Sequence, residues 1–162
     1  MGDVALEDLD IPTLVMLTGE AVRARVTEQI HAAGFADIRP AHGFVFQHLI
    51  DRSPTVGELA EQLGMTQQGA SKLVVELESL GYVTRNSDHA DHRIRRILLT
   101  ERGTACITAA RQARAEWQAA LVQRLGEPAI ATLATGLAAF AEKLGIEESV
   151  QRRQLKLPPH ER

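Results

Sequence analysis

The segment "TQQGASKLVVELESLGYVTRNSDHADHRIRRILLTERG", residues 66–103, decides the fold. Its first half predicts an amphipathic helix, because apolar residues recur every three or four positions. Those residues are Ala70, Leu73, Val74, Leu77 and Leu80. Thr66 is placed to cap the start of this helix, and Gly81 can end it in the left-handed conformation that glycine adopts without strain. The segment therefore opens with a short helix that buries one face.

A second short helix is predicted just upstream, in "SPTVGELAEQLG", residues 53–64. Thr55 and Glu58 have the T-x-x-E spacing of a capping box, in which each side chain accepts a hydrogen bond from an unpaired backbone N–H. Gly64 is the expected stop. The apolar face comprises Val56, Leu59, Ala60 and Leu63. Two short amphipathic helices joined by a glycine-containing turn are typical of a helix-turn-helix.

Two strands are predicted downstream of this pair, in "YVTRN" (residues 82–86) and "RRILLT" (residues 95–100). Ile97 and Leu99 alternate along the second strand and share a face. The polar segment between the strands is then the end of a hairpin. Helix, turn, helix and hairpin together predict a winged helix, in which the hairpin is the wing.

Helices are also predicted on both sides of the winged unit. Upstream, one helix follows the capping residue Asp10, and another follows Pro40. Downstream, Thr100 caps a long helix that runs to about Leu125, and Gly126 separates it from a second long helix. The fold class is therefore mainly α: a winged helix-turn-helix with a two-stranded β wing, flanked by N- and C-terminal helices.

These terminal helices carry more apolar surface than the small winged unit can cover, so we expect them to form a homodimer. The downstream stripes are Cys106, Ala110, Ala113, Trp117, Leu121 and Leu125, then Ile130, Leu133, Ala134, Leu137, Phe140, Ala141 and Leu144. We expect one structural domain with four regions. They are an N-terminal dimerisation helix (1–39), the winged helix-turn-helix DNA-binding region (40–103), C-terminal dimerisation helices (104–145) and a polar tail (146–162).

Composition sets bounds on the function. At 162 residues, with 44% hydrophobic and 24% charged residues, the chain fits one globular domain. No apolar run reaches the roughly 18 residues of a membrane span, and the acidic N-terminus is unlike a signal peptide. The single cysteine, Cys106, suits a reducing cytoplasm and is expected to be a small core residue. The net charge of −3 hides a basic cluster at residues 81–96, where four arginines accompany two aspartates.

Residues 66–103 resemble the MarR family (multiple antibiotic resistance regulators). The matching motifs are L-x-x-x-G from Leu77, D-x-R at Asp91 and Arg93, and L-T-x-x-G from Leu99. The resemblance implies a cytoplasmic homodimeric transcription regulator without a cofactor. It would bind a pseudo-palindromic double-stranded DNA operator and act as a repressor or an activator; we favour a repressor that a small aromatic or phenolic ligand releases. Residues 88–91 read D-H-A-D where family wings commonly read D-P-x-D, which leaves the end of the wing looser.

The second helix of a helix-turn-helix lies in the major groove with its N-terminal residues over the base edges. Glutamine can pair with adenine through two hydrogen bonds, lysine can approach guanine or phosphate, and Gly69 would let the backbone come close. The residues expected to contact DNA from this helix are Thr66, Gln67, Gln68, Ser71 and Lys72. The alternative is a merely solvated face.

The wing is expected to add arginine contacts. Arg93 is the residue predicted to enter the minor groove, where narrow A·T tracts concentrate negative potential. The resemblance implies that Asp91 orients a neighbouring arginine. Arg85, Arg95 and Arg96 are candidates for phosphate contacts, although Arg95 and Arg96 must point to opposite faces of their strand. The alternative is a charged, exposed hairpin.

Family members often bind phenolic or carboxylic compounds between the dimerisation helices and the winged unit. Side chains that fit such a ligand pocket are His42, Phe44, Phe46, His48 and Trp117. An ordinary core role for these residues is an equal alternative. Arg23 and Arg25 can pair with an anionic ligand, or can simply be solvated. The resemblance does not extend to oxidant sensing, because family members that sense oxidants carry the reactive cysteine in the first helix.

The sequence also bears on three other functions. Asp88, His89, Asp91 and His92 are suitable metal ligands, but the end of a wing offers no surrounding groups to orient the imidazoles, so no metal site is predicted. A protein-interaction module that uses a winged helix without DNA is the alternative function, favoured by the acidic net charge and only three lysines. An enzyme is not expected, because the sequence has no G-x-S-x-G, phosphate-binding glycine loop or H-E-x-x-H motif.

Overall fold

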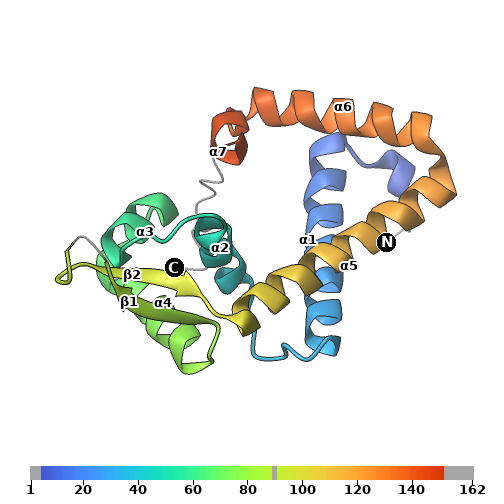
Figure 1. Cartoon of the computed structure of the whole chain (residues 1–162). Coiled ribbons are helices and arrows are strands. Elements are labelled where there is room, and N and C mark those ends of the chain that lie inside the picture. The colour runs from blue at the N-terminus through green and yellow to red at the C-terminus, as the bar shows by residue number, and fades with distance from the viewer. Residues whose placement is uncertain (1–4, 89–90, 152–162) are drawn as a thin grey trace, which may run out of the picture.

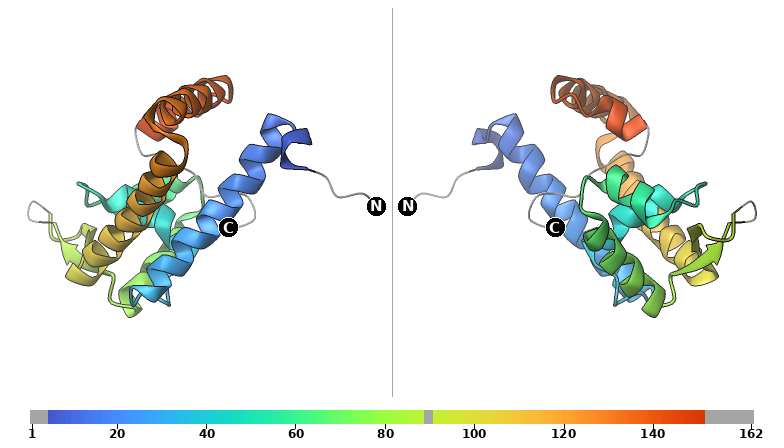
Figure 2. Two further views of the ribbon diagram at one scale, coloured as in Figure 1. Left: turned by 90° about the vertical axis from the view of Figure 1, so that its right-hand side faces the viewer. Right: turned by 90° about the vertical axis from the view of Figure 1, so that its left-hand side faces the viewer.

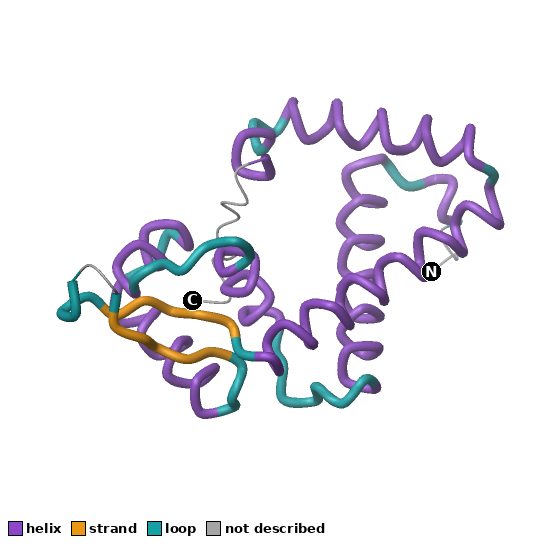
Figure 3. Tube along the Cα trace, in the orientation of Figure 1, coloured by secondary structure: helices purple, strands orange, loops and turns teal. Residues whose placement is uncertain are grey.

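The computed structural model describes residues 5–88 and 91–151, and it is mainly helical, as predicted (Figures 1 and 3). A short 3-10 helix, Leu6–Asp8, precedes the first α-helix. The remaining elements are α1 (Ile11–Ala32), α2 (Pro40–Leu49), α3 (Val56–Leu63), α4 (Gln67–Ser79), β1 (Val83–Ser87), β2 (Arg95–Leu99), α5 (Glu101–Leu125), α6 (Glu127–Lys143) and α7 (Glu147–Gln151). Within the described part of the chain, no helix is both long enough and apolar enough to cross a membrane.

The predicted caps set the helix boundaries. The Thr55 hydroxyl accepts from the Glu58 N–H at 3.2 Å, and the Glu58 carboxylate accepts from the Thr55 N–H at 2.7 Å, which confirms the capping box of α3. The other three predicted caps accept from the backbone three residues on: Asp10 at 2.9 Å, Thr66 at 3.1 Å and Thr100 at 3.1 Å. Gly64 and Gly81 have positive φ angles of 66° and 77° and end their helices as expected.

The wing is an antiparallel pair in which Val83 lies opposite Leu99 and Ser87 lies opposite Arg95. Ile97 is fully buried, and its N–H donates to the carbonyl of Pro54 at 2.9 Å, which ties β2 to the segment before α3. The predicted end of the wing includes His89 and Ala90, which lie outside the described residues.

The core is centred on the winged unit, where α2, α3, α4 and the two strands meet (Figure 1), and it extends to Ile30 of α1 and to Cys106 and Ile107 of α5. Tyr82, immediately before β1, is fully buried at its centre, and its ring packs against that of Phe46 with centroids 5.9 Å apart. The Tyr82 hydroxyl donates to Asp37, and Arg102 also donates to Asp37 at 3.1 Å. Burial raises the pKa of Tyr82 to about 12, and the Tyr82 hydrogen bond lowers the pKa of Asp37.

The long C-terminal helices leave their apolar stripes exposed. In α5 the predicted inner stripe is buried at Cys106 and Ala113, but Trp117, Leu121 and Leu125 are 39%, 38% and 49% exposed. None of the 17 residues of α6 is buried. Figure 2 shows why: α6 turns away at the end of α5, and it stands apart from the N-terminal end of α1. The polar tail begins with a short helix, α7, and its residues 152–162 lie outside the described part.

Candidate nucleic-acid interface and adjoining cavity

Helix α4 has two distinct faces. Ala70, Val74 and Leu77 are fully buried against the core. The residues predicted to contact DNA lie on the other side: Thr66, Gln67, Gln68 and Lys72 are exposed and Ser71 is half-buried. Helix α3 packs against α4 through the Gly64 turn, so α4 takes the place of the second helix of a helix-turn-helix. Its polar N-terminal turns are thereby presented as one surface, which we name the reading face (Thr66, Gln67, Gln68, Ser71 and Lys72).

Gly69 lies close to the preceding turn. A Cβ atom at this position would lie 2.8 Å from Cε of Met65 and 3.3 Å from Oγ1 of Thr66. An added methyl group would therefore require the flexible end of the Met65 side chain to move. The close approach of the Gly69 backbone to DNA stays a prediction.

The wing presents Arg93 outward, with a side chain that is 92% exposed. The Asp91 carboxylate accepts from the Arg93 backbone N–H at 3.0 Å and from Arg93 Nε at 3.2 Å. Hydrogen bonds from the Arg93 side chain and backbone hold the pKa of Asp91 below its usual value, so the pair stays ionised at neutral pH. Asp91 thus hydrogen-bonds to Arg93, and the orienting role that the resemblance implies stays a prediction.

The other three wing arginines differ in their partners. Arg85 donates to Glu78 of α4, through Nε at 3.0 Å, and this hydrogen bond raises the pKa of Arg85. Arg96 pairs with Asp88 and donates to the carbonyl of Ser53 at 3.0 Å. Arg95 lies exposed on the opposite face of β2. Arg85 and Arg96 therefore hold the wing to α4 and to the segment before α3, whereas Arg93 and Arg95 project outward.

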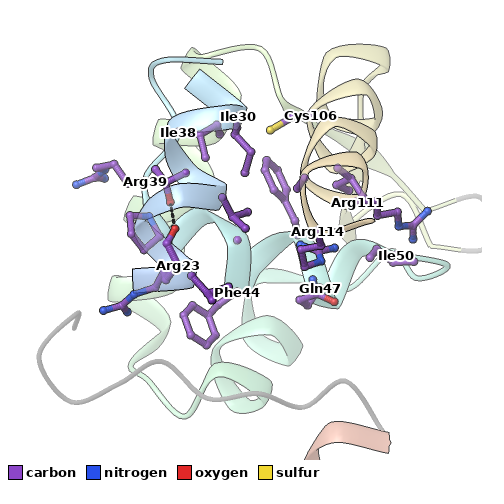
Figure 4. Close-up of a pocket in the computed structure, with 18 of the residues that line it drawn as sticks. Arg23, Ile30, Ile38, Arg39, Phe44, Gln47, Ile50, Cys106, Arg111 and Arg114 are labelled. Atoms are coloured by element: carbon purple, nitrogen blue, oxygen red, sulfur yellow. Dashed lines mark hydrogen bonds between the residues drawn. The ribbon is translucent and has the colours of Figure 1, made fainter. Parts of the chain in front are cut away.

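A cavity of about 490 Å³ lies behind the winged unit, between α1, α2 and α5 (Figure 4). Its apolar lining includes Val22, Val26, Ile30, Ile38, Phe44 and Phe46. Four arginines line it as well: Arg23 and Arg39 on one side, and Arg111 and Arg114 of α5 on the other. The arrangement is that of a pocket for a ligand with an apolar body and a negative charge.

The structure does not bring all of the predicted pocket residues together. Phe46 lines the cavity, with Phe44 beside it. His42 and His48 do not line it, and both are buried, with 0% and 1% exposure. Trp117 lies beside a separate hollow, where its Nε1 donates to Gln29 at 3.1 Å.

Three arginines of the cavity were missed by sequence reasoning. Arg111 and Arg114 stand three residues apart in α5, next to the apolar positions Ile107 and Ala110 that also line the cavity. That i, i+3 spacing beside an apolar stripe was the available signal. Arg39 gave no such signal, because it lies between two helices. Of the two arginines predicted to pair with an anionic ligand, Arg23 lines the cavity, whereas Arg25 pairs with Glu28 at 2.8 Å.

The described residues contain no group of three or more His, Cys, Asp or Glu side chains that could hold a metal ion. One of the four ligands considered for the wing, His89, lies outside those residues. Cys106 lines the cavity but is buried, and this burial raises the pKa of its thiol to about 11. The thiol is therefore protonated and unreactive at neutral pH.

The helix order and the antiparallel wing are those of a winged helix-turn-helix unit. Comparison with known proteins adds a family to this description. Residues 36–94 match a family model described as the MarR family, and this segment contains α2, α3, α4 and β1. The match covers most of the winged unit and less than half of the chain, so it shows that this unit is similar to that of the MarR family.

Solved structures share the fold across most of the chain. A MarR family protein from Bacillus stearothermophilus is 21% identical with a TM-score of 0.68, covering 83% of this chain and 93% of that one. A MepR mutant of S. aureus bound to an oligodeoxyribonucleotide is 21% identical with a TM-score of 0.63, covering 85% and 99%. S. aureus MepR bound to ethidium bromide is 20% identical with a TM-score of 0.64, covering 85% and 99%. At these identities the likeness establishes the fold.

A curated relative also matches part of the chain. Riboflavin kinase from Thermoplasma volcanium is 41% identical over 49 residues, which are 30% of this chain. The match spans only 21% of the length of that kinase. A match over so small a part of the kinase carries none of its activity over to this chain.

Proposed function

We propose that this chain is a homodimeric, sequence-specific DNA-binding transcriptional regulator that acts as a cytoplasmic repressor. In this proposal α4 enters the major groove through the reading face, and Arg93 of the wing enters the adjoining minor groove. Arg95 contacts a phosphate. Arg85 and Arg96, which were expected to contact phosphates directly, instead hold the wing in place for the other two arginines.

One observation carries the proposal. The N-terminal turns of α4 expose glutamine and lysine side chains on the side opposite a fully buried apolar face, next to a wing whose Arg93 is 92% exposed. Such side chains can pair with base edges and phosphates. One structural relative, the MepR mutant of S. aureus, was solved bound to an oligodeoxyribonucleotide, which supports the same use of this fold.

The exposed stripes of α5 and α6 support the dimer. Two copies joined there would present two reading faces to one duplex, and half-sites would lie about one helical turn, roughly 34–36 Å, apart. The operator would then be pseudo-palindromic, because the symmetry of the protein is repeated in the DNA.

We propose further that the cavity takes a small aromatic carboxylate or phenolate, which releases the operator. The apolar lining suits an aromatic body, and the four arginines suit an anion. MepR binds ethidium, a cation. A cation would be repelled by the arginines of this cavity, so a different ligand charge is expected here.

The test starts from selection of bound duplexes out of a random pool, followed by titration of the selected operator. Arg93→Ala and Lys72→Ala should each weaken binding by about tenfold, since contacts of this kind contribute roughly 1–3 kcal/mol. Affinity should also fall steeply as salt rises from about 50 to 200 mM, because bound phosphates release counterions.

Arg124→Ala is the matched control, because Arg124 is an exposed arginine in the last turn of α5, far from the wing along the chain. It should bind the operator as the unaltered protein does. If no duplex is selected at low salt, DNA binding is excluded and the interaction-module alternative takes its place.

A further inference from the structure

Residues at the start of α2 contact Glu76 of helix α4. Glu76, which follows the reading face by one turn, forms an ion pair with the guanidinium of Arg39, the N-cap residue of α2. The two side chains are 37% and 58% exposed. The other carboxylate oxygen of Glu76, Oε1, lies 3.5 Å from Nε2 of His42. Two groups from the first turn of α2 thus meet one carboxylate of α4.

His42 makes this arrangement specific. Its side chain is fully buried, and its Nδ1 accepts from the Arg39 backbone N–H at 3.2 Å. Burial lowers the pKa of His42, so the ring is neutral at pH 7. With Nδ1 as an acceptor, Nε2 of the neutral ring carries the proton. Nε2 lies 3.4 Å from Nη2 of Arg39 and 3.5 Å from Oε1 of Glu76, so the imidazole contacts both members of the ion pair from the buried side.

The same end of α2 forms a wall of the cavity. Arg39 lines the cavity together with the next residue, Pro40, and with Gly43 and Phe44 one turn further on. Figure 4 shows Arg39 at the edge of the cavity, beside Ile38. Arg39 is therefore shared: its chain borders the cavity while its guanidinium pairs with the helix that carries the reading face.

We propose that the Arg39–Glu76 ion pair, which His42 contacts, couples the binding of an anion in the cavity to the position of α4. This inference rests on the proposed function and specifies how the same site is regulated. A ligand can shift a conformational equilibrium only if it binds one state better. An anion gains Arg39 only in the state where Arg39 has left Glu76, and this difference in binding favours the state in which α4 is released.

The proposal predicts an effect opposite in sign to simple electrostatics. Glu76→Gln removes a negative charge from the helix that meets DNA, which by itself would tighten binding to phosphates. If the ion pair positions α4, Glu76→Gln instead weakens operator binding, by about fivefold or more, the lower end of typical coupling between sites. Exchanging the two charges, in the Arg39→Glu, Glu76→Arg double variant, should restore much of the affinity.

Gly43 offers a test of the cavity side that needs no identified ligand. A Cβ atom at Gly43 meets nothing within 4 Å, and the residue lines the cavity. Gly43→Glu therefore brings a carboxylate to the cavity, and Gly43→Gln is its uncharged match. Gly43→Glu should bind the operator more weakly than Gly43→Gln in the unaltered chain, and this difference should vanish when Glu76→Gln is also present.

All variants are compared as full-length protein by operator titration, with thermal unfolding measured in parallel to confirm folding. Arg25→Gln, which breaks an exposed ion pair confined to α1, is the control for loss of an arginine. This coupling is supported if Glu76→Gln weakens operator binding and the charge exchange restores it. It is overturned if folded Glu76→Gln binds the operator as tightly as the unaltered protein or more tightly. Failure of the unaltered protein to bind any duplex would instead overturn the proposed function.

Discussion

A single glycine fixes the junction between the wing and α5. A Cβ atom at Gly103 would lie 2.2 Å from the backbone carbonyl oxygen of Tyr82 and 3.0 Å from Cδ2 of Leu99. Neither a carbonyl nor a packed leucine can yield that distance without moving the strands. We expect Gly103→Ala to lower the free energy of unfolding by about 2–3 kcal/mol, as for other overpacked sites.

Gly57→Ala is the matched substitution, because a Cβ atom there meets only Oγ1 of Thr55, at 3.9 Å. Both glycines lie in the first turn of a helix, so their intrinsic helix propensities are comparable. Urea denaturation of the two variants measures the contrast. Equal midpoints would show that the strands relax around the added methyl group.

At the scale of residues, the sequence predicts interactions between near neighbours and misses those between distant ones. Asp10, Thr55, Thr66 and Thr100 were recognised as caps, because a cap bonds to backbone three positions away. The pairing of Arg85 with Glu78 and of Arg96 with Ser53 depends on how the wing folds against α3 and α4. No spacing rule in the sequence contains that information.

At the scale of elements, the first helix of the helix-turn-helix depends on its capping box. Removing the Thr55 hydroxyl leaves the Glu58 N–H without its acceptor at 3.2 Å. We expect Thr55→Ala to lower the free energy of unfolding by about 1 kcal/mol, the typical value for a lost cap. Chemical denaturation measures this change.

Thr132→Ala is the control for loss of a threonine hydroxyl. The Thr132 hydroxyl donates to the carbonyl of Pro128, and both residues belong to α6. Loss of this hydroxyl should therefore change the free energy of unfolding by less than about 0.5 kcal/mol. If Thr55→Ala lowers the free energy of unfolding no more than Thr132→Ala does, α3 is stabilised by its packing alone.

Elements were predicted more fully than the surfaces they form. Periodicity placed α3, α4 and both strands, because each buries one face within the winged unit. The cavity depends on how α1 and α5 cross beside α2, and separate segments of the chain contribute its arginines and apolar lining. Periodicity identifies a buried side of each helix but does not show which helices leave a space between them.

At the scale of the whole molecule, the exposed apolar stripes indicate assembly. Leu133 and Leu137 of α6 are 49% and 46% exposed, on the same side of the helix. Apolar patches of this kind on one chain mark interfaces. We expect the protein to sediment as a dimer, and the Leu133→Lys, Leu137→Lys double variant to sediment as a monomer, because buried unpaired lysines are strongly unfavourable.

Val75→Lys is the corresponding control, because Val75 is a 49% exposed apolar residue of α4 that lies outside these stripes. It should leave the dimer intact in sedimentation velocity experiments. A monomeric unaltered protein at micromolar concentration would contradict the assembly, and a double variant that stays dimeric would place the interface elsewhere.

The chain contains one tryptophan and one tyrosine, and they lie in different parts of the molecule. Trp117 reaches Gln29 where α1 and α5 meet, whereas Tyr82 is enclosed by the winged unit. Indole emission therefore reports on the contact between α1 and α5, and near-ultraviolet dichroism of the phenol reports on the winged unit. The protein therefore has two intrinsic optical probes. Loosening of the α1–α5 contact and loosening of the winged unit can be followed separately without attaching a dye.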